Sequence, residues 1–163
     1  VVAFRNKGLD AIALRFFNIY GPGQRHDSAY ASLIPLFLHS MKNGKRPTIH
    51  GTGEQTRDFV HVHDLAKAVH AMVARSTPYE YSVANVASQT QISVLDVVQS
   101  INQCLNERRK MEAIFPLHGD AREGDVMHSC GSNKRIQGMI DWKPEISFVE
   151  GIASLLEDED ARR

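Results

Sequence analysis

The feature that most constrains this chain is a short apolar run that ends abruptly in a turn. Residues 12–17 read IALRFF, and the breaker-rich sequence NIYGPG follows at once. An apolar run of this length beside a glycine–proline cluster predicts a buried strand that leads into a loop. Strands that are apolar throughout are typical of parallel sheets, which helices cover on both faces. We therefore expect an α/β structure.

The remaining chain alternates between helical and extended patterns, which favours the same fold class. We expect N-terminal caps at Asp64, Ser93, Ser132 and Ser147. Ser93 is expected to form an imperfect capping box with Asp96, and Ser147 a true capping box with Glu150. Helices are predicted over residues 1–7 (ending at Gly8), 32–44, 64–75, 93–105, 132–139 and from 147 onward. Strands are predicted over residues 12–17, 48–50, 58–62, 81–87 and 111–117. The final EDEDARR is expected to be a solvated face or a frayed tail.

Charge and cysteine content exclude several classes of partner. Nineteen Lys and Arg balance nineteen Asp and Glu in 163 residues, so no net positive field attracts nucleic acid or an anionic membrane. No apolar run approaches the roughly 18–20 residues that a membrane-spanning helix needs. The two cysteines, Cys104 and Cys130, suggest a reducing compartment. We expect a cytoplasmic, single-domain protein.

The sequence contains no complete catalytic constellation. It has no GxGxxG dinucleotide loop, no P-loop, no GxSxG and no paired-cysteine metal pattern. His61 and His63 fall on one face of a predicted strand, but no third ligand follows from the local sequence, so no metal site is expected.

Three polar residues lie at positions where each is expected to bind either a ligand or a structural partner. Arg15 lies inside an apolar strand and must pair with a carboxylate, a carbonyl or a ligand. Asn18 follows that strand, where ligands bind in parallel sheets, although it also suits the start of a turn. Arg57, after the flexible GTGEQT, suits an anion or a salt bridge with Asp58.

The loop AREGD (121–125) carries two further candidates. Arg122 suits a phosphate, and Asp125 suits ribose hydroxyls, which donate to a carboxylate. The alternative is a mutual ion pair between these two side chains in a surface turn.

Taken together and in order, these motifs resemble the nucleotide-sugar epimerases and dehydratases of the extended short-chain dehydrogenase/reductase family. LRFFNIYGPGQ is similar to that family's LRxFNVYGPGQ, and GTGEQTRDFVHVHDLAKAV is similar to its GxGxQTRDFxxVxDxAxA block. REGDVMHSCGSNKRI and the later MIDWKPEISFVEGI resemble its RPGDV…SxxKA…LGWxPxxSxxEGI ending. The resemblance covers nearly the whole chain. The segments RDFVHV and GDVMHS are most similar to the corresponding segments of UDP-sugar 4-epimerases.

The resemblance implies that residues 1–163 are the C-terminal, substrate-binding portion of a Rossmann-like fold with its small substrate-binding subdomain. The NAD-binding half and the catalytic Tyr-x-x-x-Lys would lie upstream, so this chain would hold no catalytic residue and would be inactive alone. The implied activity of the intact parent is NAD-dependent epimerisation of a UDP-sugar at carbon 4 through a 4-keto intermediate. A sugar dehydratase or decarboxylase, or a non-catalytic nucleotide-sugar-binding protein, remains the alternative.

The same resemblance implies which residues bind ligands. Phe16 and Phe17 would line the nicotinamide end of the cofactor site. His50 replaces a usual Tyr or Phe near the base, and Glu123 replaces a usual Pro near the diphosphate. The implied substrate contacts are Asn18, Leu33, His50, Arg57, Arg122 and Asp125. Because the strand at 12–17 would lack its upstream partners, we also expect a homo-oligomer or poor solubility.

Overall fold

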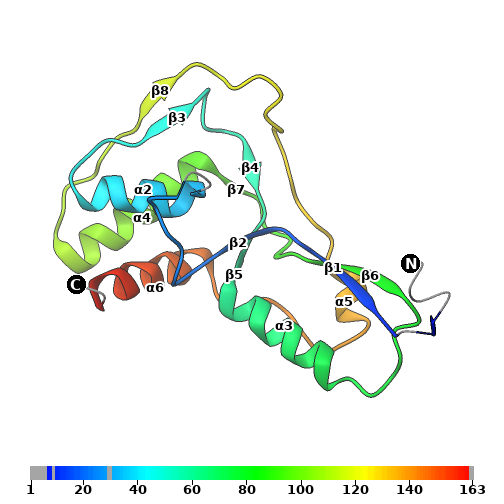
Figure 1. The fold of residues 1–163 in the computed structure, drawn as a ribbon. Coiled ribbons are helices and arrows are strands. Elements are labelled where there is room, and N and C mark those ends of the chain that lie inside the picture. The colour runs from blue at the N-terminus through cyan, green and yellow to red at the C-terminus, as the bar shows by residue number, and fades with distance from the viewer. Residues whose placement is uncertain (1–6, 9, 29–30, 162–163) are drawn as a thin grey trace.

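The computed structural model describes residues 7–8, 10–28 and 31–161, and it has the expected α/β character (Figure 1). The strands are β1 (Ile12–Phe16), β2 (Asn18–Tyr20), β3 (Thr48–His50), β4 (Thr56–Arg57), β5 (Phe59–His61), β6 (Ser82–Val86), β7 (Ile92–Ser93) and β8 (Leu117–Gly119). The helices are α2 (Leu33–Lys42), α3 (Val62–Ala74), α4 (Val94–Arg109), α5 (Lys134–Gln137) and α6 (Phe148–Ala161). The helical turn predicted before Gly8 lies almost wholly outside the described residues.

The strands associate in pairs. β1 pairs with β6, β2 with β5 and β3 with β8, all in parallel, whereas β4 and β7 are antiparallel. The run predicted as one strand over residues 12–17 changes partner at Phe17. The Phe17 amide donates to the Val86 carbonyl at 3.1 Å, and the next amide, of Asn18, donates to the Asp58 carbonyl at 3.0 Å. Asn18 therefore begins β2 rather than a turn.

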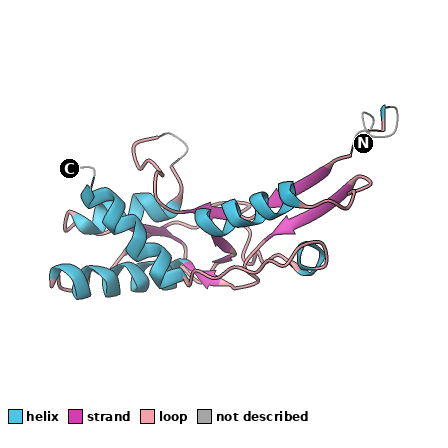
Figure 2. Cartoon of the chain, turned by 90° about the horizontal axis from the view of Figure 1, so that it is seen from below, coloured by secondary structure: helices cyan, strands magenta, loops and turns pink. Residues whose placement is uncertain are grey.

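Two apolar cores lie on either side of this junction. The first joins α2, α4 and α6, which Figure 2 shows gathered toward the end of the molecule that holds the C-terminus. The second lies between the β1–β6 pair and helices α3 and α5, with Trp142 among its buried residues. No helix in the described part of the chain combines the length and apolarity that a membrane crossing requires.

Several predicted details are wrong, and in each case a contact far along the chain decides the outcome. Asp64 does not cap α3; His61 does, while the buried Asp64 carboxylate accepts from the amides of Glu145 and Ile146. The short helix α5 begins after Asn133 rather than Ser132, because the Asn133 side chain donates to the Ala87 carbonyl.

Residues 111–116 form no strand. The Asn102 side chain, on α4, binds both the amide and the carbonyl of Ile114, at 2.8 and 3.0 Å. These bonds take up backbone groups that a ladder would need, so pairing with β3 begins only at Leu117. The capping boxes at Ser93 and Ser147 form as expected.

The described part of the acidic run, residues 157–161, continues α6 and is largely exposed, as expected of a solvated face, and its side chains also form ion pairs. The Lys42 side chain is only 3% exposed and lies 2.7 Å from Glu159 and 3.2 Å from Asp160. Arg109 hydrogen-bonds Asp160 as well, which lowers the pKa of that carboxyl. These pairs attach the end of α6 to α2 and α4.

Close packing at Gly151 supplies a test of the first core. A Cβ at this position of α6 would lie 2.1 Å from the Tyr20 hydroxyl oxygen and 2.7 Å from two ring carbons. Alanine favours a helix, but the overlap outweighs that preference. We predict that Gly151→Ala lowers the free energy of unfolding by about 1–3 kcal/mol, measured by urea denaturation.

Two controls accompany this prediction. Gly138→Ala, where the nearest atom is 3.5 Å away, should have little effect. Adding Tyr20→Phe to Gly151→Ala should recover part of the loss, because it removes the closest atom. Equal stability of Gly151→Ala and the unaltered chain would contradict the packing argument.

His61 is a buried N-cap with a definite proton assignment. Its Nδ1 accepts from the His63 amide at 3.3 Å, and its Nε2 lies 3.0 Å from the Ser154 hydroxyl. That hydroxyl donates to the Gly151 carbonyl, so Nε2 carries the imidazole proton. Burial, and then the neighbouring His63, lower the pKa of His61.

This lowered pKa has a consequence for stability. Because the pKa of His61 is lower in the folded protein than in the unfolded chain, the neutral imidazole contributes fully to stability above about pH 6.5. This contribution is lost as the pH falls through the folded pKa. We predict that the free energy of unfolding declines as the pH is lowered below about 6.5. His61→Asn keeps a capping side chain but not the titration, so it should flatten this dependence. His70→Asn, at an exposed site, should leave the pH profile unchanged.

Candidate functional site

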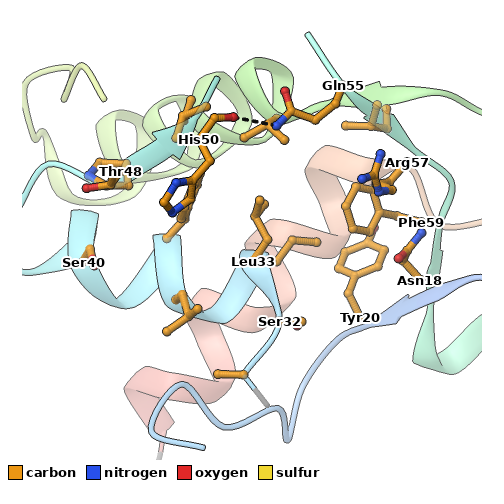
Figure 3. Close-up of a pocket in the computed structure, with 18 of the residues that line it drawn as sticks. Asn18, Tyr20, Ser32, Leu33, Ser40, Thr48, His50, Gln55, Arg57 and Phe59 are labelled. Carbon is orange, nitrogen blue, oxygen red and sulfur yellow. Dashed lines mark hydrogen bonds between the residues drawn. The ribbon is translucent and has the colours of Figure 1, made fainter. Parts of the chain in front are cut away.

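A cavity of about 690 Å³ lies between α2 and the strands β2, β3 and β4 (Figure 3). Its floor is apolar, with Leu33 on α2 and the rings of Tyr20 and Phe59 among its lining residues. All six residues expected to contact a substrate line this one cavity: Asn18, Leu33, His50, Arg57, Arg122 and Asp125. They come from three strands, one helix and one loop, so the fold gathers side chains that lie up to 107 residues apart.

Arg57 is held firmly, but not by Asp58. Its Nη2 lies 2.5 Å from Asp125 Oδ1, and its Nη1 donates to the carbonyls of Val126 at 2.5 Å and Thr56 at 2.8 Å. The two ion pairs considered as alternatives in the sequence are therefore wrong: among the described residues, Arg57 does not pair with Asp58, and Arg122 does not pair with Asp125. The carboxylate instead aims the guanidinium, which is 24% exposed at the cavity wall.

The carboxylate of Asp58 faces the opposite way, into the protein, where it is fully buried. It accepts from the Ser88 amide at 2.7 Å, the Ser88 hydroxyl at 2.8 Å, and the amides of Gln89 and Gly131 at 3.0 Å each. Sequence reasoning missed this role. Its only local signal is a charged residue between two short strands, which also fits a surface ion pair.

The loop that carries Arg122 and Asp125 belongs to a longer connection, residues 120–131, that we call the strap. The strap runs along the outside of the molecule from β8 toward α5 (Figure 1). It is fastened beside β4, where the Thr56 amide donates to the Met127 carbonyl at 2.7 Å, and at its end by the Asp58–Gly131 bond. Asp58 and the neighbouring Arg57 thus bind the same strap at two places.

Gln55 is a further cavity residue that the sequence analysis did not select. It is buried, and its amide donates to the His50 carbonyl at 2.9 Å and faces Asp125 Oδ2 at 3.5 Å. The His50 ring hydrogen-bonds the Asp120 carbonyl through Nδ1 at 3.2 Å. Both sides of the cavity are therefore connected to the strap.

The residues expected at the cofactor, Phe16 and Phe17, lie in a second hollow that Asn18 also borders. The Phe16 side chain is 52% exposed. Arg15 lines the same hollow and is exposed; it makes no hydrogen bond or ion pair with the described residues, so of the partners considered for it a ligand stays a prediction. This hollow offers an aromatic wall but no glycine-rich turn, so these residues alone do not fit a whole dinucleotide.

His61 and His63 do not point to a metal. Their rings meet edge to face at 5.0 Å, and both nitrogens of His61 already have partners. Across residues 7–8, 10–28 and 31–161, no three His, Cys, Asp or Glu side chains come together as metal ligands.

Comparison with known proteins places this chain in a family. Residues 1–87 match the NAD dependent epimerase/dehydratase family. A dTDP-L-rhamnose 4-epimerase of Burkholderia thailandensis is 31% identical over 142 residues, which are 87% of this chain and 38% of that protein. A UDP-N-acetyl-alpha-D-glucosaminuronate decarboxylase of Bacillus cytotoxicus is 29% identical over 93% of this chain and 46% of its own length.

A solved structure extends the likeness to the fold. The UDP-N-acetylglucosamine 4-epimerase of Methanobrevibacter ruminantium, in complex with UDP-N-acetylmuramic acid, superposes with a TM-score of 0.88 at 31% identity. It covers 99% of this chain and 50% of that one. The chain belongs to the NAD-dependent epimerase/dehydratase family, and it spans about half the length, or less, of these relatives.

The Asp58 cluster yields a stability prediction. Asp58→Asn replaces one accepting oxygen by an amino group that faces backbone donors, so buried amides lose their partner. We predict a loss of about 3 kcal/mol in the free energy of unfolding. Asp141→Asn, at an exposed site, should change stability little. If the two variants unfolded at the same urea concentration, the role given to Asp58 would be wrong.

Proposed function

We propose that this chain is the C-terminal, substrate-binding half of an NAD-dependent UDP-sugar 4-epimerase. The cavity beside Arg57 would hold the nucleoside diphosphate. The observation that carries this proposal is the convergence of all six expected contact residues on one cavity.

The cationic side chains of the cavity suit a diphosphate. Arg57 is already oriented by Asp125 and two carbonyls, so little of its side-chain freedom remains to be lost on binding. Arg122 is exposed on the strap and forms no ion pair with the described residues, which leaves its charge available to phosphate. Asn18 lies between the two hollows and donates to the Asp58 carbonyl through Nδ2, at 2.8 Å.

The other lining residues suit a nucleoside. Leu33 gives an apolar surface, and the His50 ring is half-buried and anchored, so it can stack on a base. Asp125 Oδ1 is used by Arg57, but its second oxygen faces only Gln55 at 3.5 Å. That oxygen is suited to accept from a ribose hydroxyl.

The chemical step itself is assigned outside this chain. Epimerisation by this family is NAD-dependent, and the described residues fit only one wall of a dinucleotide site. The chain's own contribution would be to hold the nucleotide while the sugar reacts. We expect no turnover of UDP-glucose or UDP-galactose by this chain with added NAD.

A dehydratase or decarboxylase would need the same nucleotide cavity. The related decarboxylase noted above belongs to this group, whereas two of the relatives are 4-epimerases. The motifs RDFVHV and GDVMHS support the epimerase as the leading proposal. The resemblance implies that the residues that would separate these activities lie upstream, near the catalytic Tyr.

The proposal is tested by comparing UDP with uridine in ligand-observed NMR titrations. Arg57→Ala removes a charged hydrogen-bond donor worth about 1.5–3 kcal/mol, so UDP affinity should fall about 10- to 100-fold. Uridine affinity should not change, because uridine has no phosphates. Arg75→Ala, whose guanidinium lies over the Tyr79 ring, is the matched control. Absence of UDP binding to the unaltered chain, or an unchanged UDP affinity in Arg57→Ala, would overturn the proposed site.

A further inference from the structure

Arg46 is a further arginine of the cavity, and it comes from the segment that leads into β3. The cavity follows α2, with Asn18, Arg57 and Phe59 near one end and Ser40 and Thr48 near the other (Figure 3). Arg46 comes two residues before Thr48, in the connection between α2 and β3, and it lines the same cavity. Neither its charge nor its position is explained by binding a diphosphate beside Arg57.

The guanidinium of Arg46 is fixed by neutral partners only. Its Nε donates to the Phe115 carbonyl and its Nη2 to the Pro116 carbonyl, both at 2.8 Å. The backbone beside it is fixed too, since the Leu117 amide donates to the Pro47 carbonyl at 2.8 Å. No carboxylate pairs with Arg46 among the described residues, and its Nη1 makes no hydrogen bond with them. A positioned, uncompensated donor therefore remains at this end of the cavity.

The hydrogen-bonding chemistry of the Arg46 guanidinium indicates which group of a ligand it would bind. A guanidinium only donates hydrogen bonds, so it favours a carbonyl oxygen and disfavours an amino group. Uracil and thymine carry a carbonyl at the ring position where cytosine carries an amino group. A nucleotide whose diphosphate lies at Arg57 would extend its base along α2 toward Arg46.

We infer that Arg46 determines base specificity by donating to the carbonyl oxygen that uracil carries at the ring position where cytosine carries an amino group, so that the cavity prefers UDP to CDP. This inference rests on the proposed function, because it takes the cavity to hold a nucleoside diphosphate. It adds to that function the reason why a keto pyrimidine is accepted and an amino pyrimidine is rejected.

A purely structural role for Arg46 makes a different prediction. If the side chain only joined the start of β3 to the segment before β8, its loss would weaken both nucleotides alike. The ratio of the UDP and CDP dissociation constants separates the two roles. UDP and CDP share the ribose and the diphosphate, so effects common to both cancel in this ratio.

The experiment measures both dissociation constants by NMR titration for the unaltered chain and three variants. The unaltered chain should prefer UDP by about tenfold, the effect of one well-placed charged hydrogen bond. Arg46→Ala should bring the ratio close to one. Arg57→Ala should weaken both nucleotides and keep the preference, and Lys45→Ala, a neighbouring cation outside the cavity lining, should change neither value.

Each outcome separates the two proposals. If the unaltered chain binds UDP and CDP equally, or if Arg46→Ala keeps the preference, the inference on Arg46 is overturned while the diphosphate site stands. If UDP does not bind at all, both fail. Arg46→Met, which keeps the aliphatic stem, repeats the measurement if circular dichroism shows that Arg46→Ala is unfolded.

Discussion

The buried carboxylate of Asp58 is the contact on which the rest of the site depends. It draws together the end of β6, the residue before β5 and the end of the strap, which are separated by 30 to 73 residues in the chain. Arg57, one residue earlier, faces the cavity and binds the same strap through Asp125. Asp58 lies between β4 and β5, where the chain is extended, and its side chain points away from that of Arg57, so one charge faces the interior and the other faces the cavity.

This arrangement explains what the sequence could and could not predict. The capping boxes at Ser93 and Ser147 involve residues three apart, and they form as expected. The alternation of strands and helices is likewise a local pattern. The carboxylate that binds Arg57 and the amides that bind the side chains of Asp58 and Asp64 come from segments at least 30 residues away, and no local pattern identifies them. The candidate cavity residues were selected by ordered motifs. Gln55 lies inside one of these motifs but was not selected, and Arg46, whose partners are carbonyls 69 and 70 residues away, lies outside them.

The two hollows differ in how much of each this chain provides. The large cavity is enclosed by α2, three strands and the strap, all from within the described residues. The hollow at Phe16 and Phe17 has an exposed ring and an arginine without a partner in the described part of the chain. This asymmetry agrees with a chain that spans about half of its relatives' length. Under the proposed function, this chain would therefore provide more of the substrate side of the site than of the cofactor side.

The change of strand partner at Phe17 also determines how the fold responds to a residue inserted at this point of the chain. Up to Phe17 the backbone bonds to β6, and from Asn18 it bonds to β5, with no spacer between the two ladders. Side chains alternate along a strand, so one inserted residue at this junction would turn every later side chain of β2 to the other face. Tyr20 would leave the first core, and Asn18 would leave both hollows. A surface loop without site residues can lengthen more easily, whereas the residue count at this junction sets the phase between the two halves of the molecule.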